Sequence, residues 1–288
     1  MNKKKNSFVD LGSRGRLNKN NKLNDLTGKE WLKFTKSWFI HRPPRRKTDE
    51  ILHPAKFPET LVEEFIKFFT KKNGWVLDPF MGTGSTLISA AGVNRNSVGI
   101  ELNKNYYRTS SNRISKRGFK KLAFPINGDS LHLKELLSKN GFAKIKFDYT
   151  ITSPPYWNQL MRNSIRQKDR SAKGLDTKYS ENKNDIGNIN SYEEFIEKQA
   201  QVFDQVYDAT KQNGYLTIIT NNVYFEGRLY PLAYDTAISL TKRGEKSWVL
   251  KDEKIWLQDD KKLIALGVNN AWVGNRHHQY CLIFRKEK

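Results

Sequence analysis

Hydrophobic positions in the middle of the chain alternate between helix-like and strand-like spacing. After Pro58, apolar residues recur every three or four positions as far as Asn73-Gly74, which predicts a helix. Short apolar runs and amphipathic segments then follow in turn. The predicted strands cover residues 75–78, 97–102, 122–127 and 147–152, and the predicted helices cover residues 85–91, 104–116 and 130–139. This alternation predicts an α/β fold with a mostly parallel sheet.

The last third of the chain continues this pattern but ends differently. The predicted elements are a helix over 192–210, a strand over 215–220, a helix over 231–241 and two strands over 248–257 and 279–285. The last two strands have no helical pattern between them. We therefore expect a C-terminal antiparallel hairpin that closes one edge of the otherwise parallel sheet.

Two segments fall outside the regular pattern. Residues 1–50 carry 14 Lys or Arg against 5 acidic residues, which predicts a basic, partly mobile extension before a main domain over residues 51–288. Within the extension, a short helix is expected over residues 29–39. Its apolar residues expected to dock on the core are Trp31, Leu32, Phe34, Phe39 and Ile40. Residues 158–190 lose periodicity and form a basic loop insertion, a length typical of a functional segment.

Charge and cysteine content narrow the functional class. The formal net charge is +21, which favours a polyanionic partner, nucleic acid first, although a lysine-rich composition is the plain alternative. Cys281 is the single cysteine, so an internal disulfide is excluded, and its apolar neighbours favour a buried strand position over a nucleophile. No apolar stretch approaches the roughly 18 residues of a membrane span, so we expect a cytoplasmic protein.

A polar, glycine-containing turn joins the first predicted strand to a helix. The turn runs from Asp78 through Pro79 and Phe80 to Gly82 and Gly84. Small residues let the backbone approach a ligand, and the helix N-terminus presents free N–H groups. The spacing differs from G-x-G-x-x-G and the phosphate-binding lysine is missing, which weakens dinucleotide and triphosphate interpretations.

Acidic residues follow the next two predicted strands. Glu101 ends its strand where doubly wound folds place an acid against ribose hydroxyls, and Asp129 stands where an acid can accept from an adenine amino group. Each also has a plainer interpretation. Taken alone, an acid at a strand end is more typical of a solvated residue or a helix cap, but the position of Glu101 after the first motif favours the ribose interpretation. Asp129 is equally typical of a helix N-cap.

The most specific motif is Thr152-Ser153-Pro154-Pro155-Tyr156-Trp157 at the end of the fourth predicted strand. Two prolines fix the backbone and remove two donors, so carbonyl and hydroxyl acceptors face a cleft with aromatic side chains beside them. Such a platform suits a planar amino group, with Tyr156 stacking on the ring that carries it. The alternative is a rigid turn with no chemical role.

Together these residues resemble the N4-cytosine and N6-adenine DNA methyltransferases, which have an F-x-G cofactor motif and a [SDN]-P-P-[YFW] catalytic motif. The resemblance covers residues 26–288 and includes the segments 53–59 and 275–280, which look like family signatures. It implies a Rossmann-like methyltransferase fold, with residues 51–288 as the catalytic domain. It also implies S-adenosylmethionine as the cofactor, S-adenosylhomocysteine as its product and double-stranded DNA as the partner.

The resemblance assigns roles residue by residue. Asp78, Phe80 and the two glycines would surround the methionine and sugar, Glu101 the ribose and Asp129 the adenine. The full set of expected cofactor residues is Lys56, Phe57, Pro58, Asp78, Pro79, Phe80, Gly82, Gly84, Ser85, Thr86, Glu101, Asp129 and Thr152. The expected catalytic residues are Ser153, Pro154, Pro155 and Tyr156.

Serine before the prolines resembles the N4-cytosine branch, and N6-adenine methylation is the alternative. Cytosine C5 methylation is disfavoured because it requires a Pro-Cys nucleophile. An RNA or protein amide methyltransferase and a noncatalytic DNA-binding homologue also remain open. No metal is expected, because the adjacent His277 and His278 would point to opposite faces of a strand.

Basic residues beside these motifs are expected to contact DNA, because a large recognition domain has no counterpart here. The expected DNA-contacting residues are Arg42, Arg45, Arg46, Lys47, Trp157, Arg162, Arg166, Lys168, Arg170 and Lys173. The resemblance further implies a monomer or homodimer associated with the nucleoid. A cognate restriction endonuclease is an expected partner.

Overall fold

The computed structural model describes residues 7–42, 58–157 and 185–287. Within them, an eight-stranded sheet has the order β3-β11-β12-β8-β7-β4-β5-β6. Its strands are β3 (Trp38–Ile40), β4 (Trp75–Asp78), β5 (Asn96–Glu101), β6 (Ala123–Asn127), β7 (Phe147–Thr152), β8 (Thr210–Thr220), β11 (Val249–Leu257) and β12 (His278–Arg285). Strands β4 to β8 are parallel, and β12 is antiparallel to both β8 and β11. The predicted α/β fold with a mostly parallel sheet is confirmed.

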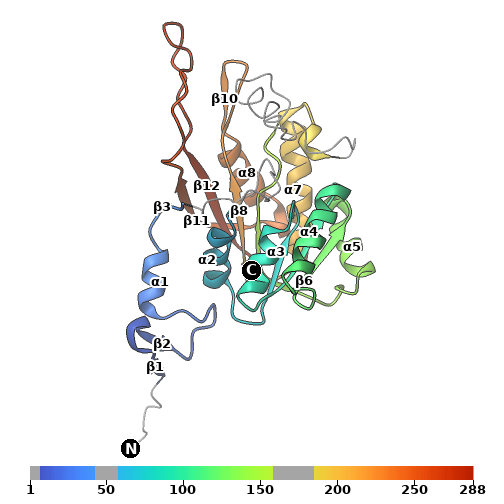
Figure 1. Cartoon of the computed structure of the whole chain (residues 1–288). Helices are drawn as coiled ribbons and strands as arrows, with labels where there is room; N and C mark the ends of the chain where they lie inside the picture. Colours follow the sequence, from blue (N-terminus) through green and yellow to red (C-terminus); the bar gives the residue numbers. More distant parts are fainter. Residues whose placement is uncertain (1–6, 43–57, 158–184, 288) are drawn as a thin grey trace, which may run out of the picture.

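Helices cover both faces of this sheet (Figure 1). They are α1 (Gly28–Phe34), α2 (Glu59–Phe69), α3 (Ser85–Gly92), α4 (Lys104–Lys116), α5 (Leu133–Lys139), α7 (Tyr192–Ala209) and α8 (Leu232–Thr241). Because successive strand residues point to opposite faces, Val76 packs with α2 while Leu77 packs with α5, α7 and α8. The alternating apolar strands therefore build two cores, one on each face. No helix among the described residues is long and apolar enough to cross a bilayer.

The remaining elements are short. Two separate hairpins pair β1 (Phe8–Asp10) with β2 (Arg16–Asn18) and β9 (Val223–Phe225) with β10 (Arg228–Tyr230). The 3-10 turns are Gly12–Arg14, Ser130–His132, Ile186–Asn188 and Gly244–Lys246. Ser130–His132 shortens the helix that we expected over residues 130–139, because its first turn is 3-10 before α5 begins at Leu133.

The structure differs from expectation at the sheet edge beside the hairpin. The C-terminal hairpin is present as β11 and β12, but β3 pairs parallel to β11 and forms the outer strand. The helix expected over residues 29–39 ends at Phe34, and Trp38–Ile40 is strand. Leu32, expected to dock, is 73% exposed. The change of direction after Phe34 lets the backbone of residues 38–40 pair with β11.

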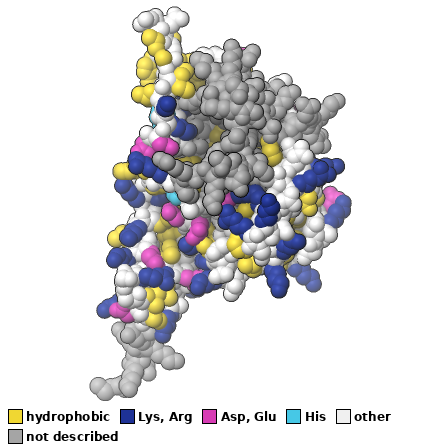
Figure 2. All heavy atoms as spheres, viewed as in Figure 1, with side chains coloured by type: hydrophobic (Ala, Val, Ile, Leu, Met, Phe, Trp, Pro, Cys, Tyr) yellow, Lys and Arg dark blue, Asp and Glu magenta, His cyan; other side chains and the backbone are white. Residues whose placement is uncertain are grey.

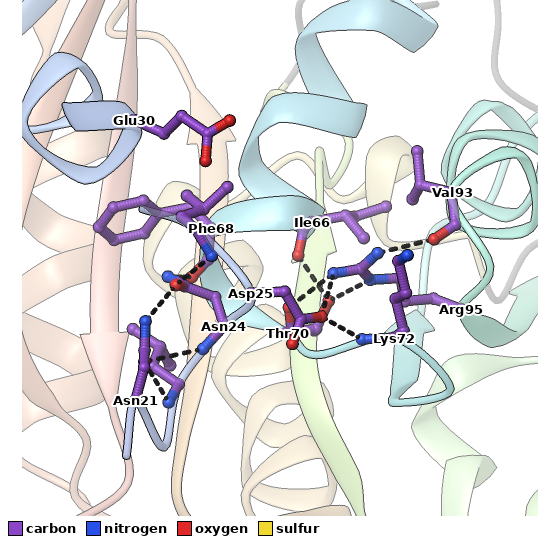
Figure 3. Close-up of polar contacts among 12 residues, drawn as sticks. Asn21, Asn24, Asp25, Glu30, Ile66, Phe68, Thr70, Lys72, Val93 and Arg95 are labelled. Atoms are coloured by element: carbon purple, nitrogen blue, oxygen red, sulfur yellow. Dashed lines mark hydrogen bonds and ion pairs between the residues drawn. The ribbon is translucent and has the colours of Figure 1, made fainter. Parts of the chain in front are cut away.

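Part of the basic N-terminal region is tied to the core by buried polar contacts (Figure 3). We call residues 21–27 with α1 the N-terminal flank. Asn24 is buried and its side-chain amide donates to Phe68 O at 2.6 Å, at the end of α2. Asp25 accepts from Lys72 N at 2.8 Å and lies 3.6 Å from the buried Arg95 guanidinium. The flank is therefore joined to the turns that precede β4 and β5.

Candidate functional site

The carboxyl ends of the parallel strands meet at one edge of the sheet, which we call the carboxyl edge. Strand β4 ends at Asp78, β5 at Glu101 and β7 at Thr152, and β4 lies between β5 and β7. The chain leaves β4 toward β5 on one side and returns at β7 on the other. In α/β sheets, ligands bind in the crevice at such a switch in strand order. The candidate cofactor and catalytic loops therefore follow neighbouring strands at this switch point.

Asp78 connects these two loops. Its Oδ1 atom accepts hydrogen bonds from Thr152 Oγ1 at 2.7 Å and from Phe80 N at 3.0 Å. Burial raises the pKa of Asp78 to about 6, and the Thr86 and Thr152 hydroxyls offset that rise only in part. A cationic ligand beside this carboxyl group would favour its ionised form.

Glu101 holds the other side of the same loop. Gly82 N donates to Glu101 Oε2 at 2.8 Å, and Asn103 N donates to Oε1 at 2.7 Å. Burial raises the pKa of Glu101 to about 7, and the nearby charges of Asp185 and Asp78 add to the rise. Two carboxyl groups with raised pKa values at the ends of adjacent strands are typical of a functional site.

The backbone between Asp78 and α3 has the shape of a ligand-binding turn. Gly84 caps α3 with a φ of 82°, and a Cβ atom there would lie 2.8 Å from Ser110 Oγ. Ser85 Oγ is buried and has no hydrogen-bond partner among the described residues. Buried polar atoms are normally paired, so this hydroxyl fits a polar ligand. S-adenosylmethionine fits the donor and acceptor set, because it carries a sulfonium, an ammonium group and ribose hydroxyls.

Asp129 acts as a cap in the structure. Its Oδ1 atom accepts from Leu131 N at 2.9 Å, at the start of the 3-10 turn. The adjacent Ser130 hydroxyl donates to Pro79 O and so joins this turn to the candidate cofactor loop. The helix-capping interpretation is therefore present, and contact between Asp129 and an adenine ring stays a prediction.

The segment expected to complete the cofactor site is described only in part. Pro58 is half-buried and its carbonyl accepts from Val62 N at 3.2 Å, at the start of α2. Lys56 and Phe57 lie outside the described residues.

The catalytic motif directly follows β7, so Ser153 is adjacent in sequence to the residue that contacts Asp78. Ser153 is half-buried, and its Oγ donates to Tyr156 OH at 3.2 Å. Tyr156 is 8% exposed and in turn donates to Gln279 Oε1 at 3.3 Å. Its ring packs with Phe195 in a buried cluster beside the motif. Stacking of a target ring on Tyr156 stays a prediction.

Trp157 corrects one expectation. We predicted a DNA contact, but the indole is 4% exposed and packs against Tyr192, Phe225 and Tyr230 at centroid distances of 5.0, 5.4 and 4.6 Å. Its Nε1 donates to Asn190 O at 3.1 Å. The ring and the single donor are thus engaged within the protein, and Trp157 anchors the end of the catalytic motif by packing against α7 and the hairpin of β9 and β10.

The other predicted DNA-contacting residues are mostly outside the described ranges. Arg42 is exposed and forms an ion pair with Asp259 at 2.6 Å. Figure 2 shows Lys and Arg side chains over much of the viewed surface, with fewer acidic side chains between them. The predicted DNA-contacting residues that lie outside the described ranges are Arg45, Arg46, Lys47, Arg162, Arg166, Lys168, Arg170 and Lys173.

Two residues at the site carried no role in the sequence prediction. Asp185 lies close enough to Glu101 to raise its pKa, and Gln279 contacts Tyr156 from β12. Gln279 lies in the signature segment 275–280, but nothing in that segment indicates its contact with Tyr156. Asp185 lies in the predicted loop insertion, where no motif marks it. Cys281, two residues after Gln279, is fully buried, and burial raises the pKa of its thiol to about 12. Within the described ranges, no group of three or more His, Cys, Asp or Glu is placed to hold a metal ion.

Comparison with known proteins decides the family. A family model described as DNA methylase matches residues 1–112 and 147–288, which include both loops of the site. The chain belongs to the DNA methylase family. The resemblance drawn from its motifs is therefore confirmed.

Individual relatives match shorter stretches. Type II methyltransferase M.BglI of Bacillus subtilis is 37% identical over 91 residues, which are 32% of this chain and 26% of that protein. M.BglII of the same species is 28% identical over 141 residues, 49% of this chain and 34% of that protein. The matched stretch thus spans only about a quarter to a third of these relatives. Among solved structures, TrmN from Thermus thermophilus has a TM-score of 0.48 at 10% identity and covers 79% of this chain and 48% of its own.

Proposed function

We propose that this DNA methylase family member transfers a methyl group from S-adenosylmethionine to the exocyclic N4 amine of cytosine in duplex DNA. The contact between Thr152 Oγ1 and Asp78 Oδ1 carries the proposal. It joins the candidate cofactor loop to the residue immediately before Ser153. A methyl donor held at Asp78 and an amine held at Ser153 would therefore be neighbours.

The residues of this chain act mainly by positioning. Asp78 and Glu101 would face the positively charged and hydroxyl-bearing parts of the cofactor, which supplies a methyl group on a cationic sulfur. Ser153 Oγ and the Pro154 carbonyl would accept hydrogen bonds from the target amine and direct its lone pair toward that methyl group. Holding two reactants in line removes much of the entropic barrier to reaction.

The choice of base rests on Ser153. Serine before the prolines resembles the N4-cytosine branch of the family, and this resemblance supports cytosine N4 over adenine N6. A serine hydroxyl could by its chemistry accept a hydrogen bond from either amine. The net charge of +21 supports a nucleic-acid substrate. Because relatives of this chain are named type II methyltransferases, we place it in restriction–modification or genome marking, with a restriction endonuclease as the expected partner.

The decisive experiment is expression in cells that lack DNA methylation, followed by sequencing that detects modified bases. N4-methylcytosine at a fixed sequence is the expected result. Detection of N6-methyladenine instead would show that the target base is adenine. Purified protein with methyl-labelled cofactor and plasmid DNA, tRNA or protein separates DNA from other substrates. Labelling of tRNA or protein alone would contradict a DNA methyltransferase.

Substitution of Ser153 tests the proposed chemistry. Ser153→Ala should lower turnover by about 100-fold or more while leaving cofactor affinity nearly unchanged, because the hydroxyl is proposed to contact the target amine and not the cofactor. Ser138→Ala, on the exposed side of α5, is the matched control and should retain full turnover. Full turnover by Ser153→Ala would contradict the role of this hydroxyl.

A further inference from the structure

Tyr156 bridges the candidate catalytic serine to a residue that is remote in sequence. Its hydroxyl lies 3.2 Å from Ser153 Oγ and 3.3 Å from Gln279 Oε1. Gln279 follows the first residue of β12 and comes 123 positions after Tyr156. The three side chains form a short hydrogen-bonded series that leads from the catalytic loop into the sheet.

The position of Gln279 is set by strands on both sides. It stands opposite Trp256 of β11, and the next residue, Tyr280, stands opposite Thr220 at the end of β8. Because β12 runs antiparallel to β8, its beginning lies at the carboxyl edge beside the catalytic loop. Neighbouring side chains point to opposite faces, so Tyr280 turns away toward Tyr234, while Gln279 reaches Tyr156.

The direction of hydrogen bonding follows from the chemistry of the amide oxygen. Gln279 Oε1 can only accept, so the Tyr156 proton points to Gln279. The lone pairs of Tyr156 OH then remain to accept the proton of Ser153. A serine hydroxyl has one proton, and here that proton is engaged inside the protein. Ser153 Oγ would thus present only lone pairs to the crevice.

We infer that Gln279 is a positioning residue that acts through Tyr156 to hold Ser153 as a hydrogen-bond acceptor toward the target amine. The inference rests on the proposed function, because it requires a substrate group that donates hydrogen bonds. It gives the serine a property that an ionised aspartate has by nature, since a carboxylate carries no proton to point at the amine. Gln279 itself does not contact the substrate.

If the hydrogen bonds ran in the opposite direction, Ser153 would present a proton to the target amine. If Gln279 donated from its amide nitrogen, Tyr156 would donate to Ser153, and the serine proton would face the amine protons. Replacement by glutamate distinguishes the two directions, because an ionised glutamate can only accept. Gln279→Glu should therefore keep turnover within a few-fold of the wild type, whereas Gln279→Leu should lose about tenfold, the effect of one hydrogen bond.

The test measures kcat, the KM for DNA and the cofactor Kd of the full chain on the DNA that the wild type methylates. Gln279→Leu and Tyr156→Phe should each lower kcat by about tenfold with little change in cofactor Kd. The double variant should be no slower than either single variant, because both break the same series. Gln258→Leu, a matched change on the same hairpin, should leave kcat unchanged.

Each outcome decides the inference. Wild-type turnover by Gln279→Leu, or equal loss in Gln279→Glu and Gln279→Leu, overturns the positioning role while the proposed function stands. Additive losses in the double variant also overturn it. A wild-type protein that methylates no DNA overturns the proposed function and this inference together. If Gln279→Leu does not fold, Tyr156→Phe and Gln279→Glu carry the same comparison, since each leaves the shape of its side chain intact.

Discussion

The N-terminal flank and the carboxyl edge both bury charged and polar groups, but they satisfy them differently. Where the flank meets the core, the guanidinium of Arg95 lies 3.6 Å from Asp25 of the flank. It donates to Thr70 Oγ1, Thr70 O and Val93 O at 3.1, 2.8 and 2.7 Å (Figure 3). At the carboxyl edge, buried polar atoms lack hydrogen-bond partners among the described residues. They include Ser85 Oγ, Thr220 Oγ1, Asn221 Oδ1 and His277 Nε2.

Polar groups that are already paired contribute to folding stability, whereas unpaired buried groups can contribute to ligand binding. A buried polar atom without a partner costs free energy in the absence of a ligand, and a ligand that pairs with it recovers that cost. Where the flank meets the core, the guanidinium of Arg95 already has its hydrogen-bond partners among the described residues. Changes in the flank should therefore alter unfolding alone, and changes at the edge should alter cofactor binding.

The largest effect is expected at Arg95. Arg95→Ala leaves buried carbonyls at Thr70 and Val93 without donors and should lower the free energy of unfolding by about 2–4 kcal/mol. Urea denaturation measures the loss. Arg14→Ala removes a more exposed pair with Glu30 and should cost at most about 1 kcal/mol. A weaker cofactor affinity in folded Arg95→Ala would contradict the prediction that this region affects only the free energy of unfolding.

Asp78→Asn should change stability in the opposite direction. The pKa of Asp78 is raised from 3.8 to about 6, so ionisation destabilises the folded state increasingly as the pH rises through this interval. The isosteric amide removes that penalty and should stabilise the free protein by about 1–3 kcal/mol above pH of about 7, with no gain below about 4. Thermal unfolding at several pH values measures the difference.

A neighbouring aspartate provides the control for this variant. Asp148 accepts from Trp75 N at 2.7 Å and pairs with Lys211, so Asp148→Asn should lower stability. Asp78→Asn should also bind S-adenosylmethionine at least about tenfold more weakly, because it loses a charge that favours a cation. Stabilisation without loss of affinity would exclude Asp78 from the cofactor site.

Cofactor binding should depend on pH in a related way. Glu101 and Asp78 have pKa values raised to about 7 and about 6, and a cationic ligand favours their ionised forms. Affinity should therefore increase by about tenfold as the pH rises from about 5.5 to about 7.5, with release of protons on binding. Calorimetry in buffers of different ionisation enthalpy counts those protons. Proton uptake would contradict the proposed contacts.

The smallest effect is expected at the start of α1. Thr27 and Glu30 form a capping box, in which the Thr27 side chain accepts from Glu30 N and the Glu30 side chain accepts from Thr27 N. Thr27→Ala should lower the free energy of unfolding by about 1 kcal/mol without affecting cofactor affinity. Thr35→Ala, at the exposed end of the same helix, should cost less. Equal losses would show that the cap contributes little.

The turn and strands that carry the candidate cofactor residues could be predicted because their determinants are local. Asp78, Gly82 and Gly84 lie in one turn between adjacent elements, and hydrophobic periodicity located those elements within a few residues. Predicting the position of Glu101 required only the next strand along the chain. The pairing of β4 with β5 brings these groups together independently of the conformation of the rest of the chain.

The target half depends on contacts that sequence spacing does not reveal. Trp157 looks like a stacking platform beside the prolines, but residues from α7 and from the hairpin of β9 and β10 enclose it. Gln279 was part of a recognised segment, yet its contact with Tyr156 spans 123 positions. Strand β3 was missed because three residues are too few to establish a period of two.

Cys281 makes the strand that carries Gln279 observable in solution. It is the only thiol in the chain, and it is fully buried between β8 and β11 with its pKa raised to about 12. A thiol reagent can modify it only while β12 is transiently detached, so the labelling rate under native conditions counts those openings. The added mass of one label per molecule then records how often the sheet opens beside the candidate site.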